Sequence, residues 1–200
     1  MHVEVLGWNA DASSPSVRPL NGTKPCELGV YHNFALIRYS DGTVDSFSSL
    51  DFPNCPWLSQ CIDQVKSTET CKSIHFAEAF LIVVCHDDSL YVVKPFIEKS
   101  VLGRSVSVNA VACGMKHCLV LANQRAFVYG HGEEGQLGLG PDLLHAEQLV
   151  TMPISSVRCV AANAYHSAIV TEPYGELYTF GSNAYARLGI ADTDSTVVYT

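Results

Sequence analysis

Two stretches of this sequence repeat one another: VACGMKHCLVLANQRAFVYGHGEEGQLGLG, residues 111–140, and VAANAYHSAIVTEPYGELYTFGSNAYARLGI, residues 160–190. His117 in the first stretch corresponds to His166, which lies 49 residues later. Gly130 corresponds to Gly181, which lies 51 residues later. The offset grows by two inside the unit, so the extra residues fall between two halves that otherwise match.

Each copy contains two strand patterns separated by a turn. The patterns are rich in β-branched and aromatic residues and are bounded by turn formers; they cover residues 119–121 and 127–129, and residues 168–170 and 177–180. The intervening turn occupies residues 122–125 in one copy and 171–176 in the other. A hairpin turn tolerates such a change of length, so each copy is predicted to contain a β-hairpin.

Two weaker copies lie upstream, in residues 29–47 and 74–93. The first places His32 at the position of His117, and Asp41-Gly42 then marks a hairpin turn. The second places Phe80 at the histidine position. These positions are spaced by 48, 37 and 49 residues along the chain. Repeated units of about 50 residues with several short strands are typical of an all-β propeller, built from four-stranded antiparallel blades.

The motifs resemble those of one propeller family. The pattern of the regulator-of-chromosome-condensation repeat is V-A-x-G-x-x-H, then aromatic-x-aromatic-Gly, then G-Q-L-G, and residues 111–140 carry all three parts. Residues 160–190 depart from the pattern at Asn163 and at Ala186-Arg187. No Trp-Asp dipeptide and no paired kelch glycines occur. This resemblance implies a ring of seven blades.

Seven units of about 50 residues need roughly 350 residues, so 200 residues predict an incomplete ring of about four blades. Residues 26–50 and 71–95 are predicted as degenerate blades, and residues 108–140 and 157–190 as fuller ones. Residues 1–20 are predicted to supply a strand of the closing blade and a linker. We expect an open arc whose last sheet is exposed to solvent, which is an aggregation liability.

The repeated residues predict structural roles. His32, His117 and His166 are expected to be buried imidazoles bonded to backbone within each blade, because buried polar groups need partners. Gly130, Gly135 and Gly138 suit turns and close backbone approach, and Asn183 is expected in a left-handed conformation. No nucleophile elbow or phosphate-binding loop occurs. We therefore expect no enzyme, and no catalytic, cofactor-binding or metal residues; the partner-binding residues are left unassigned.

The eight cysteines are expected to be reduced, with Cys113 and Cys118 buried as small apolar groups in or beside strands. The N-terminus carries no basic segment of a signal peptide, which favours free thiols over a disulfide framework. Cys55, Cys61, Cys71 and His75 superficially resemble a zinc finger, but the spacing order differs from the usual one.

Charge and hydropathy narrow the function classes. The net charge of −8 disfavours direct contact with nucleic acid and favours a basic protein partner. No apolar run is long enough to cross a membrane. We expect a monomeric, non-catalytic interaction platform of the nucleus or cytosol. The resemblance implies a small GTPase, a histone or a chromatin regulator as partner, and the opening residues are similar to a single-ring chromatin-associated subfamily. Two alternatives are an exchange factor for a Ran-type GTPase and a propeller fragment of a larger protein such as a ubiquitin ligase.

Overall fold

The computed structural model describes residues 4–7, 16–19, 25–31, 34–40, 44–48, 71–78, 80–93, 106–190 and 197–198. Within these ranges the chain is all-β apart from one short 3-10 helix, as the sequence predicts. Among the residues described, no helix has the length and apolar character needed to span a bilayer.

The first half of the chain forms three small sheets. A ribbon pairs β1 (Glu4–Gly7) with β2 (Ser16–Pro19). Blade 1 comprises β3 (Pro25–Tyr31), β4 (Phe34–Tyr39) and β5 (Val44–Ser48). Blade 2 comprises β6 (Cys71–Phe76), β7 (Leu81–Cys85) and β8 (Leu90–Val93). Each of these two blades has three antiparallel strands among the described residues.

The second half forms two four-stranded antiparallel sheets. Blade 3 comprises β9 (Val108–Cys113), β10 (His117–Ala122), β11 (Arg125–His131) and β12 (His145–Thr151). Blade 4 comprises β13 (Val157–Asn163), β14 (His166–Thr171), β15 (Leu177–Ser182) and β16 (Val197–Val198), with the 3-10 helix η1 (Ala184–Ala186) between the last two. The fourth strands β12 and β16 lie beyond the stretches predicted as blades, residues 108–140 and 157–190, because their sequences carry no repeat signal.

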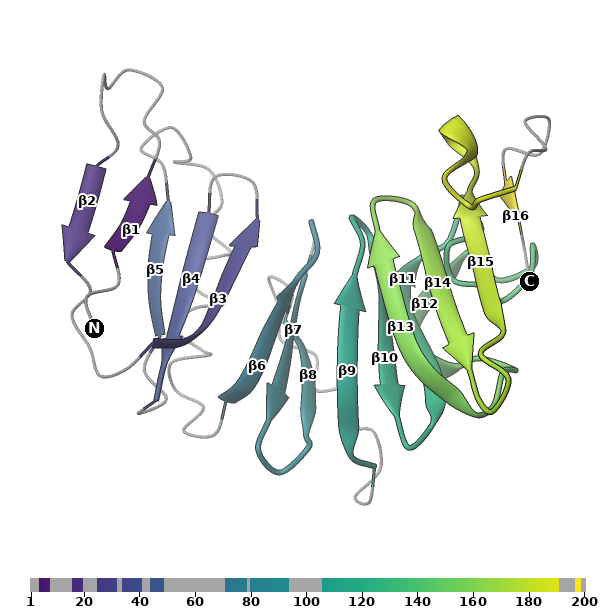
Figure 1. The fold of residues 1–200 in the computed structure, drawn as a ribbon, viewed down its shortest axis with the longest axis horizontal. Coiled ribbons are helices and arrows are strands. Elements are labelled where there is room, and N and C mark those ends of the chain that lie inside the picture. Colours follow the sequence, from purple (N-terminus) through teal and green to yellow (C-terminus); the bar gives the residue numbers. More distant parts are fainter. Residues whose placement is uncertain are drawn as a thin grey trace.

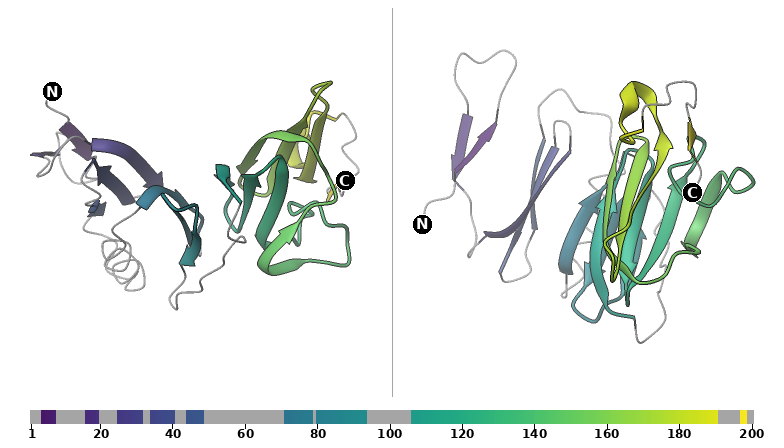
Figure 2. Two further views of the ribbon diagram at one scale, coloured as in Figure 1. Left: turned by 90° about the horizontal axis from the view of Figure 1, so that it is seen from below. Right: turned by 45° about the vertical axis from the view of Figure 1, so that its right-hand side comes forward.

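The sheets follow one another in chain order around an open arc, with the two termini at opposite ends (Figures 1 and 2). The arc is a partial propeller, as predicted. The first strands of neighbouring blades, β6, β9 and β13, lie next to one another along the arc. The two core clusters show that blade 3 packs face to face on blade 2 and on blade 4.

Packing between blades explains why β10 is an unbroken apolar strand. Alternate residues face opposite ways: Cys118 and Val120 pack against blade 2, whereas Leu119 and Leu121 pack against blade 4. All six residues of β10 are therefore buried. In β14 buried residues alternate with half-buried ones, because one face of blade 4 has no neighbouring sheet among the described residues. The outer face of β14 is thus half-buried among the described residues, and the predicted full exposure of the last sheet stays a prediction.

The register confirms the equivalence of blades 2, 3 and 4, with one exception in detail. The N–H of Gly114 donates to the carbonyl of His117 at 2.9 Å, and that of Ala77 donates to the carbonyl of Phe80 at 2.9 Å. His166 lies opposite Asn163 across a turn of the same length. Phe80 takes the histidine position as predicted, but it precedes β7 by one residue, whereas His117 and His166 are the first residues of their strands.

In blade 1 the predicted alignment on His32 is wrong. Tyr31 lies directly opposite Phe34, as Asn163 lies opposite His166, so Phe34 takes the position of the repeat histidine. His32 itself lies outside the described residues. The G-x-x-H match at His32 gives the wrong alignment, because the pairing of the two hairpin strands, and not the histidine, sets the strand register.

The hairpin turns carry the predicted change of length. In blade 3 the turn is Asn123-Gln124, and both residues have positive φ, as a tight two-residue hairpin requires. In blade 4 residues 172–176 connect the same two strands.

Gly130 and Gly181 allow backbone to cross closely. Their φ angles are 105° and 107°, and a Cβ at either position would collide with the carbonyl oxygen of Lys116 or Tyr165. Gly135 and Gly138 also adopt positive φ, as predicted. Asn183 does not: its φ is −95°, and its Oδ1 instead accepts the N–H of Leu188 at 3.3 Å.

Four cysteines have described side chains, Cys85, Cys113, Cys118 and Cys159, and all four are free thiols. Cys113 and Cys118 lie opposite each other in β9 and β10. Cys118 is buried as predicted, but Cys113 is only half-buried, and it lies on β9, an edge strand of its sheet. Burial, and then the contact with Cys113, raises the pKa of the Cys118 thiol well above its usual range.

Candidate interaction edge

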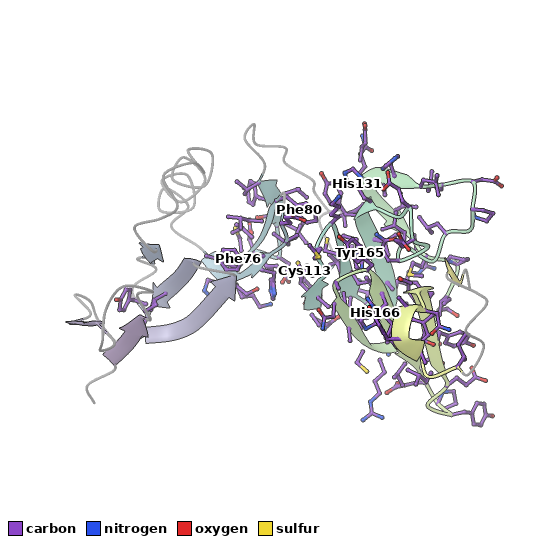
Figure 3. The ribbon with its side chains drawn as sticks, turned by 90° about the horizontal axis from the view of Figure 1, so that it is seen from above. Phe76, Phe80, Cys113, His131, Tyr165 and His166 are labelled. Carbon is purple, nitrogen blue, oxygen red and sulfur yellow. The ribbon has the colours of Figure 1, made fainter. Side chains whose placement is uncertain are left out.

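One edge of the arc gathers the longest loops of blades 3 and 4. We call it the upper loop edge and define it by residues 114–116, 132–144, 164–165 and 183–190, which follow β9, β11, β13 and β15; the arrows of β9, β13 and β15 point upward in Figure 1. Figure 3 is viewed from above, with Cys113, His131, Tyr165 and His166 among the labelled side chains. The shorter turns at residues 123–124 and 172–176 lie at the opposite edge.

Beneath this edge, His117 connects blade 3 to blade 4. Its Nε2 lies 2.8 Å from Oγ of Ser167, and that hydroxyl donates to the carbonyl of Gln136 at 2.8 Å. Because the hydroxyl proton is committed to the carbonyl, Nε2 must carry the imidazole proton and donate it to Ser167. The buried Nδ1 has no hydrogen-bond partner. An unprotonated nitrogen fits this surrounding better than a second N–H group would, which agrees with a proton on Nε2.

Burial lowers the pKa of His117 to about 4, with a smaller contribution from His166. The imidazole is therefore neutral at pH 7. The predicted bond to backbone within the same blade is wrong, since the partner is a side chain of the next blade. A neutral imidazole enclosed between two blades fits the structural role predicted for this histidine better than it fits a catalytic role.

A second connection runs through equivalent turn residues. The N–H of Glu78 donates to the carbonyl of Met115 at 2.7 Å, and the N–H of Met115 donates to the carbonyl of Ala164 at 2.9 Å. Glu78 follows Ala77 and Met115 follows Gly114, and these preceding residues bond to the carbonyls of Phe80 and His117 in the same way. Blades 2, 3 and 4 are therefore joined by one repeated backbone bond, which holds this edge in a fixed geometry.

His166 is half-buried, unlike His117. Partial burial, and then the nearby guanidinium of Arg187, lowers its pKa. Arg187 replaces Gln136 of the repeat and donates its Nε to the carbonyl of Ala184 at 2.7 Å. The two histidines share a backbone position but differ in surroundings, because only His117 is covered by a following blade.

The outer surface of the edge carries exposed apolar side chains. Leu143 and Leu144 lie on the long loop of blade 3, and Ile190 follows the loop of blade 4. Tyr185 on η1 is 98% exposed, with the guanidinium of Arg187 5.9 Å from its ring centroid. Exposed aromatic rings beside arginine are frequent anchors of protein interfaces.

The opposite edge has its own exposed pair, Tyr174 and Leu177. Between them Glu176 accepts a hydrogen bond from the Tyr178 hydroxyl at 3.1 Å, which raises the pKa of that phenol. This exposed pair belongs to a single hairpin of blade 4, whereas the exposed apolar side chains of the upper loop edge come from two blades.

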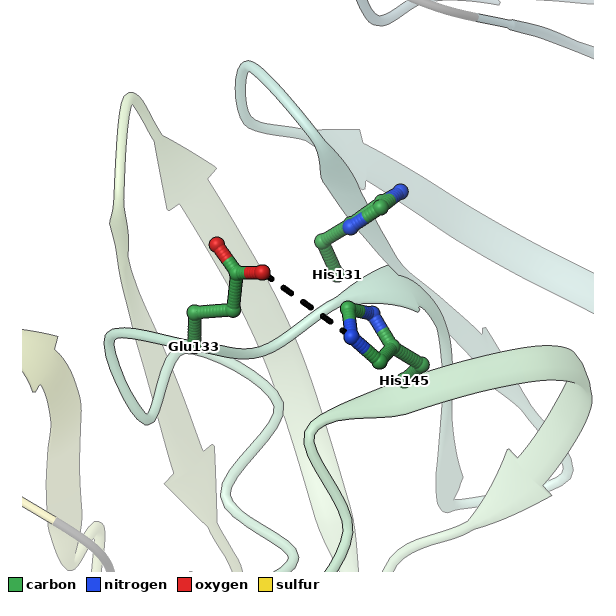
Figure 4. A group of neighbouring side chains, drawn as sticks. All are labelled: His131, Glu133 and His145. Atoms are coloured by element: carbon green, nitrogen blue, oxygen red, sulfur yellow. Dashed lines mark ion pairs between the residues drawn. The ribbon is translucent and has the colours of Figure 1, made fainter.

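Pairing of β11 with β12 brings together three polar side chains at the base of the 132–144 loop of the upper loop edge: His131, Glu133 and His145 (Figure 4). Their proximity has no signature in the sequence, because the two histidines are 14 residues apart and β12 has no recognisable pattern. Of the zinc-finger-like residues weighed in the sequence, Cys55 and Cys61 lie outside the described residues. His75 lies 3.0 Å from the Ser73 hydroxyl in β6.

Comparison with known proteins gives relatives of several kinds. The chain is 33% identical over 211 residues to the ultraviolet-B receptor UVR8 of Arabidopsis thaliana, covering 98% of this chain and 45% of that protein. It is 35% identical over 92 residues to the dog (Canis lupus familiaris) X-linked retinitis pigmentosa GTPase regulator, covering 43% of this chain and 9% of that protein. It is also 38% identical over 88 residues to human E3 ubiquitin-protein ligase HERC2, covering 42% of this chain and 2% of that protein. No protein-family model matches the chain.

Solved structures show the same fold at low identity. Yeast RCC1, determined in complex with Kap60, superimposes with a TM-score of 0.74 and 15% identity, over 94% of this chain and 50% of that one. Human WBSCR16 superimposes with a TM-score of 0.71 and 16% identity, over 94% and 55%. The chain thus spans about half the length, or less, of the proteins that it matches.

Proposed function

Because the chain belongs to the RCC1-repeat family of β-propellers, we propose that it is a non-catalytic protein-interaction platform whose partner docks on the upper loop edge. The proposal rests on which side chains are buried and which are exposed at this edge. His117 and Ser167, whose side chains could act as a base or a nucleophile, are buried and hydrogen-bonded to each other between blades. The exposed groups are apolar and aromatic, as Leu144 and Tyr185 illustrate.

The relatives support a binding role over a shared reaction. Their names describe a receptor, a GTPase regulator and a ubiquitin ligase, which have no reaction in common. A fold that serves such different proteins is best understood as a scaffold for recognition. We propose no catalytic activity for this segment.

The charge of the chain favours a basic partner. The net charge is −8, and an acidic surface attracts basic proteins through long-range electrostatic steering. Core histones are strongly basic proteins. We therefore propose that the partner is a basic chromatin protein and that binding takes place in the nucleus.

Binding to recombinant core histones tests the proposal, with affinity measured by biolayer interferometry at fixed salt. The double variant Leu144→Ser/Tyr185→Ser alters the upper loop edge. The matched control Tyr174→Ser/Leu177→Ser removes a similar exposed pair from the opposite edge. We expect the first variant to weaken binding by at least about tenfold, as loss of interface anchors does, and the control to change it less than about twofold. Equal losses in both variants, or no binding by the wild type, would refute the proposed edge and partner.

Similarity to a GTPase regulator favours one alternative, nucleotide exchange. A Ran-type GTPase loaded with a fluorescent nucleotide distinguishes the two functions. Under the proposal, catalytic amounts of the protein leave nucleotide release at its intrinsic rate. Accelerated release that saturates with GTPase concentration would replace the platform with an exchange factor.

A further inference from the structure

The upper loop edge holds a group of side chains that the repeat does not require. His131 is the last residue of β11 and His145 the first of β12, and the antiparallel register places them directly opposite each other. Their rings meet edge to face with centroids 4.7 Å apart. Two imidazoles therefore project side by side from adjacent strand ends.

The third side chain comes from the loop that joins the two strands. Glu133 lies two residues after His131, and its Oε1 is 3.9 Å from Nε2 of His145 (Figure 4). One ligand atom from each of the three residues lies within 4.8 Å of the other two. The sequence brings them together only through the pairing of β11 with β12.

The backbone beneath this group is held in place at both strand ends. The N–H of His131 donates to the carbonyl of Lys116 at 2.8 Å. The N–H of Gly132 donates to the carbonyl of Leu144 at 2.7 Å, which closes the neck of the loop beside the two histidines. The Cα positions are therefore fixed while the exposed side chains keep rotational freedom: His145 is 50% exposed and Glu133 is 63% exposed.

Comparison with blade 4 shows that the fold does not need these residues. At the equivalent positions of the repeat, Ser182 replaces His131 and Ala184 replaces Glu133. Blade 4 forms the same strand and turn without any ligand side chain at those places. The three groups in blade 3 are thus an addition to the propeller unit and free for a separate task.

We propose that His131, Glu133 and His145 form a binding site for a divalent transition metal, with Zn²⁺ as the ion. Two imidazole nitrogens and one carboxylate oxygen are a donor set that suits Zn²⁺ and excludes Mg²⁺ and Ca²⁺, which prefer oxygen ligands alone. Ligand bonds of about 2.0–2.1 Å in a tetrahedral site put donor atoms about 3.3 Å apart. The three ligand atoms lie within 4.8 Å of one another, so a bound ion would have to draw these exposed side chains closer together.

The site leaves one coordination position open. Three protein ligands are one fewer than a closed structural zinc site has. Because all three side chains are exposed, the remaining position faces solvent and accepts a water molecule. This metal site goes beyond the proposed function and does not depend on it, since its ligands belong to this chain alone.

Zinc binding is measured directly on the 200-residue protein by competition with a chromophoric chelator. Four proteins are compared: the wild type, His131→Ala/His145→Ala, Glu133→Gln, and a control, His86→Ala, which removes an exposed histidine from the turn between β7 and β8. A second control, Cys55→Ser/Cys61→Ser, tests for zinc held by cysteines. Thermal unfolding followed by circular dichroism verifies that each variant is folded.

We expect the wild type and both controls to bind one zinc ion with the same affinity. The double histidine variant should weaken binding by far more than tenfold, and Glu133→Gln by about tenfold. In a ¹H–¹⁵N spectrum of the histidine rings, Zn²⁺ should shift His131 and His145 and leave His86 unchanged. Unchanged affinity in the double histidine variant, or loss of binding in the cysteine control, would overturn the assignment.

Discussion

His117 illustrates how a single side chain of the repeat joins two blades. It is fully buried, donates to Ser167 of the next blade, and lies against Gly114, where an added Cβ would collide with the imidazole ring. Blade 2 fills the same position with Phe80, which packs edge to face on Tyr129 at 5.1 Å. A planar ring therefore fills this position in both blades, and the hydrogen bond to Ser167 is present in blade 3 but not in blade 2.

This comparison sets the relative cost of two substitutions. His117→Ala removes the ring and leaves a cavity, so it should lower the free energy of unfolding by about 3 kcal/mol. His117→Phe keeps the ring and loses only the donor to Ser167, whose hydroxyl still donates to Gln136. The phenylalanine variant should therefore cost about 1 kcal/mol. Urea unfolding measures both, and an equal loss would show that the hydrogen bond, not ring packing, dominates.

The lowered pKa of His117 makes stability depend on pH. The unfolded imidazole titrates near 6.5 and the folded one at about 4, so between these values the unfolded chain binds more protons. Stability from the neutral ring is fully present above pH 6.5 and is lost as pH falls toward 4, by up to about 3 kcal/mol. His117→Phe lacks this component. Urea unfolding of both proteins at pH 7 and pH 4.5 should show the wild type losing more stability; parallel losses would contradict it.

At the scale of the element, the loop after the third strand has the same shape in blades 3 and 4 despite different residues. The N–H of Gly135 donates to the carbonyl of Gly132 at 2.8 Å, and that of Ala186 donates to the carbonyl of Asn183 at 2.9 Å. Gly135 has a φ of 78° and Ala186 one of 54°. Alanine thus occupies a left-handed position that the other copy gives to glycine.

Ala186→Gly should therefore raise the free energy of unfolding, by about 0.5–1 kcal/mol, because it relieves the steric cost of an L-residue at positive φ. Ala184→Gly in the same short helix is the matched control. Ala184 is outside the left-handed region, so its replacement adds only chain entropy to the unfolded state and should destabilise by a similar amount. Chemical denaturation of the two variants checks the opposite signs, and destabilisation by both would contradict the argument.

At the scale of the whole molecule, the arc has an inner blade and an outer blade of the same design. Blade 3 is covered on both faces, by Ile82 and Val84 on one side and by Ile169 and Phe180 on the other. Blade 4 is covered on one face among the described residues. Stability should therefore be distributed unevenly along the chain.

Amide hydrogen exchange measures this distribution. Amides of β10 should exchange at least about tenfold more slowly than those of β14, since local opening of β10 must separate two packed faces and opening of β14 only one. Both are central strands of four-stranded sheets, so their backbone bonding is matched. The amides of residues 174–176 in the turn between β14 and β15 serve as the fast-exchanging internal reference. Equal protection of β10 and β14 would mean that the exposed face of blade 4 is covered in solution.

Much of the repeat unit could be predicted because its hairpins are local. The strand pairs of blades 3 and 4, the turn between them and its change of length, and the crossing at Gly130 and Gly181 all depend on residues close together in sequence. Alternating apolar residues and turn formers specify such pairs without reference to distant parts of the chain. The family resemblance and the partial ring followed from the same motifs.

Contacts that depend on strand register or on packing between blades could not be predicted from the sequence. The place of Phe34 in blade 1, the fourth strand β12, and the bond from His117 to Ser167 all depend on register or on the packing of one blade against the next. The group of His131 and His145 forms for the same reason, because residues far apart in sequence meet only when β12 pairs with β11. Local propensity specifies a hairpin, but the free energy that selects neighbours comes from burying whole faces together, and no short stretch of sequence contains that information.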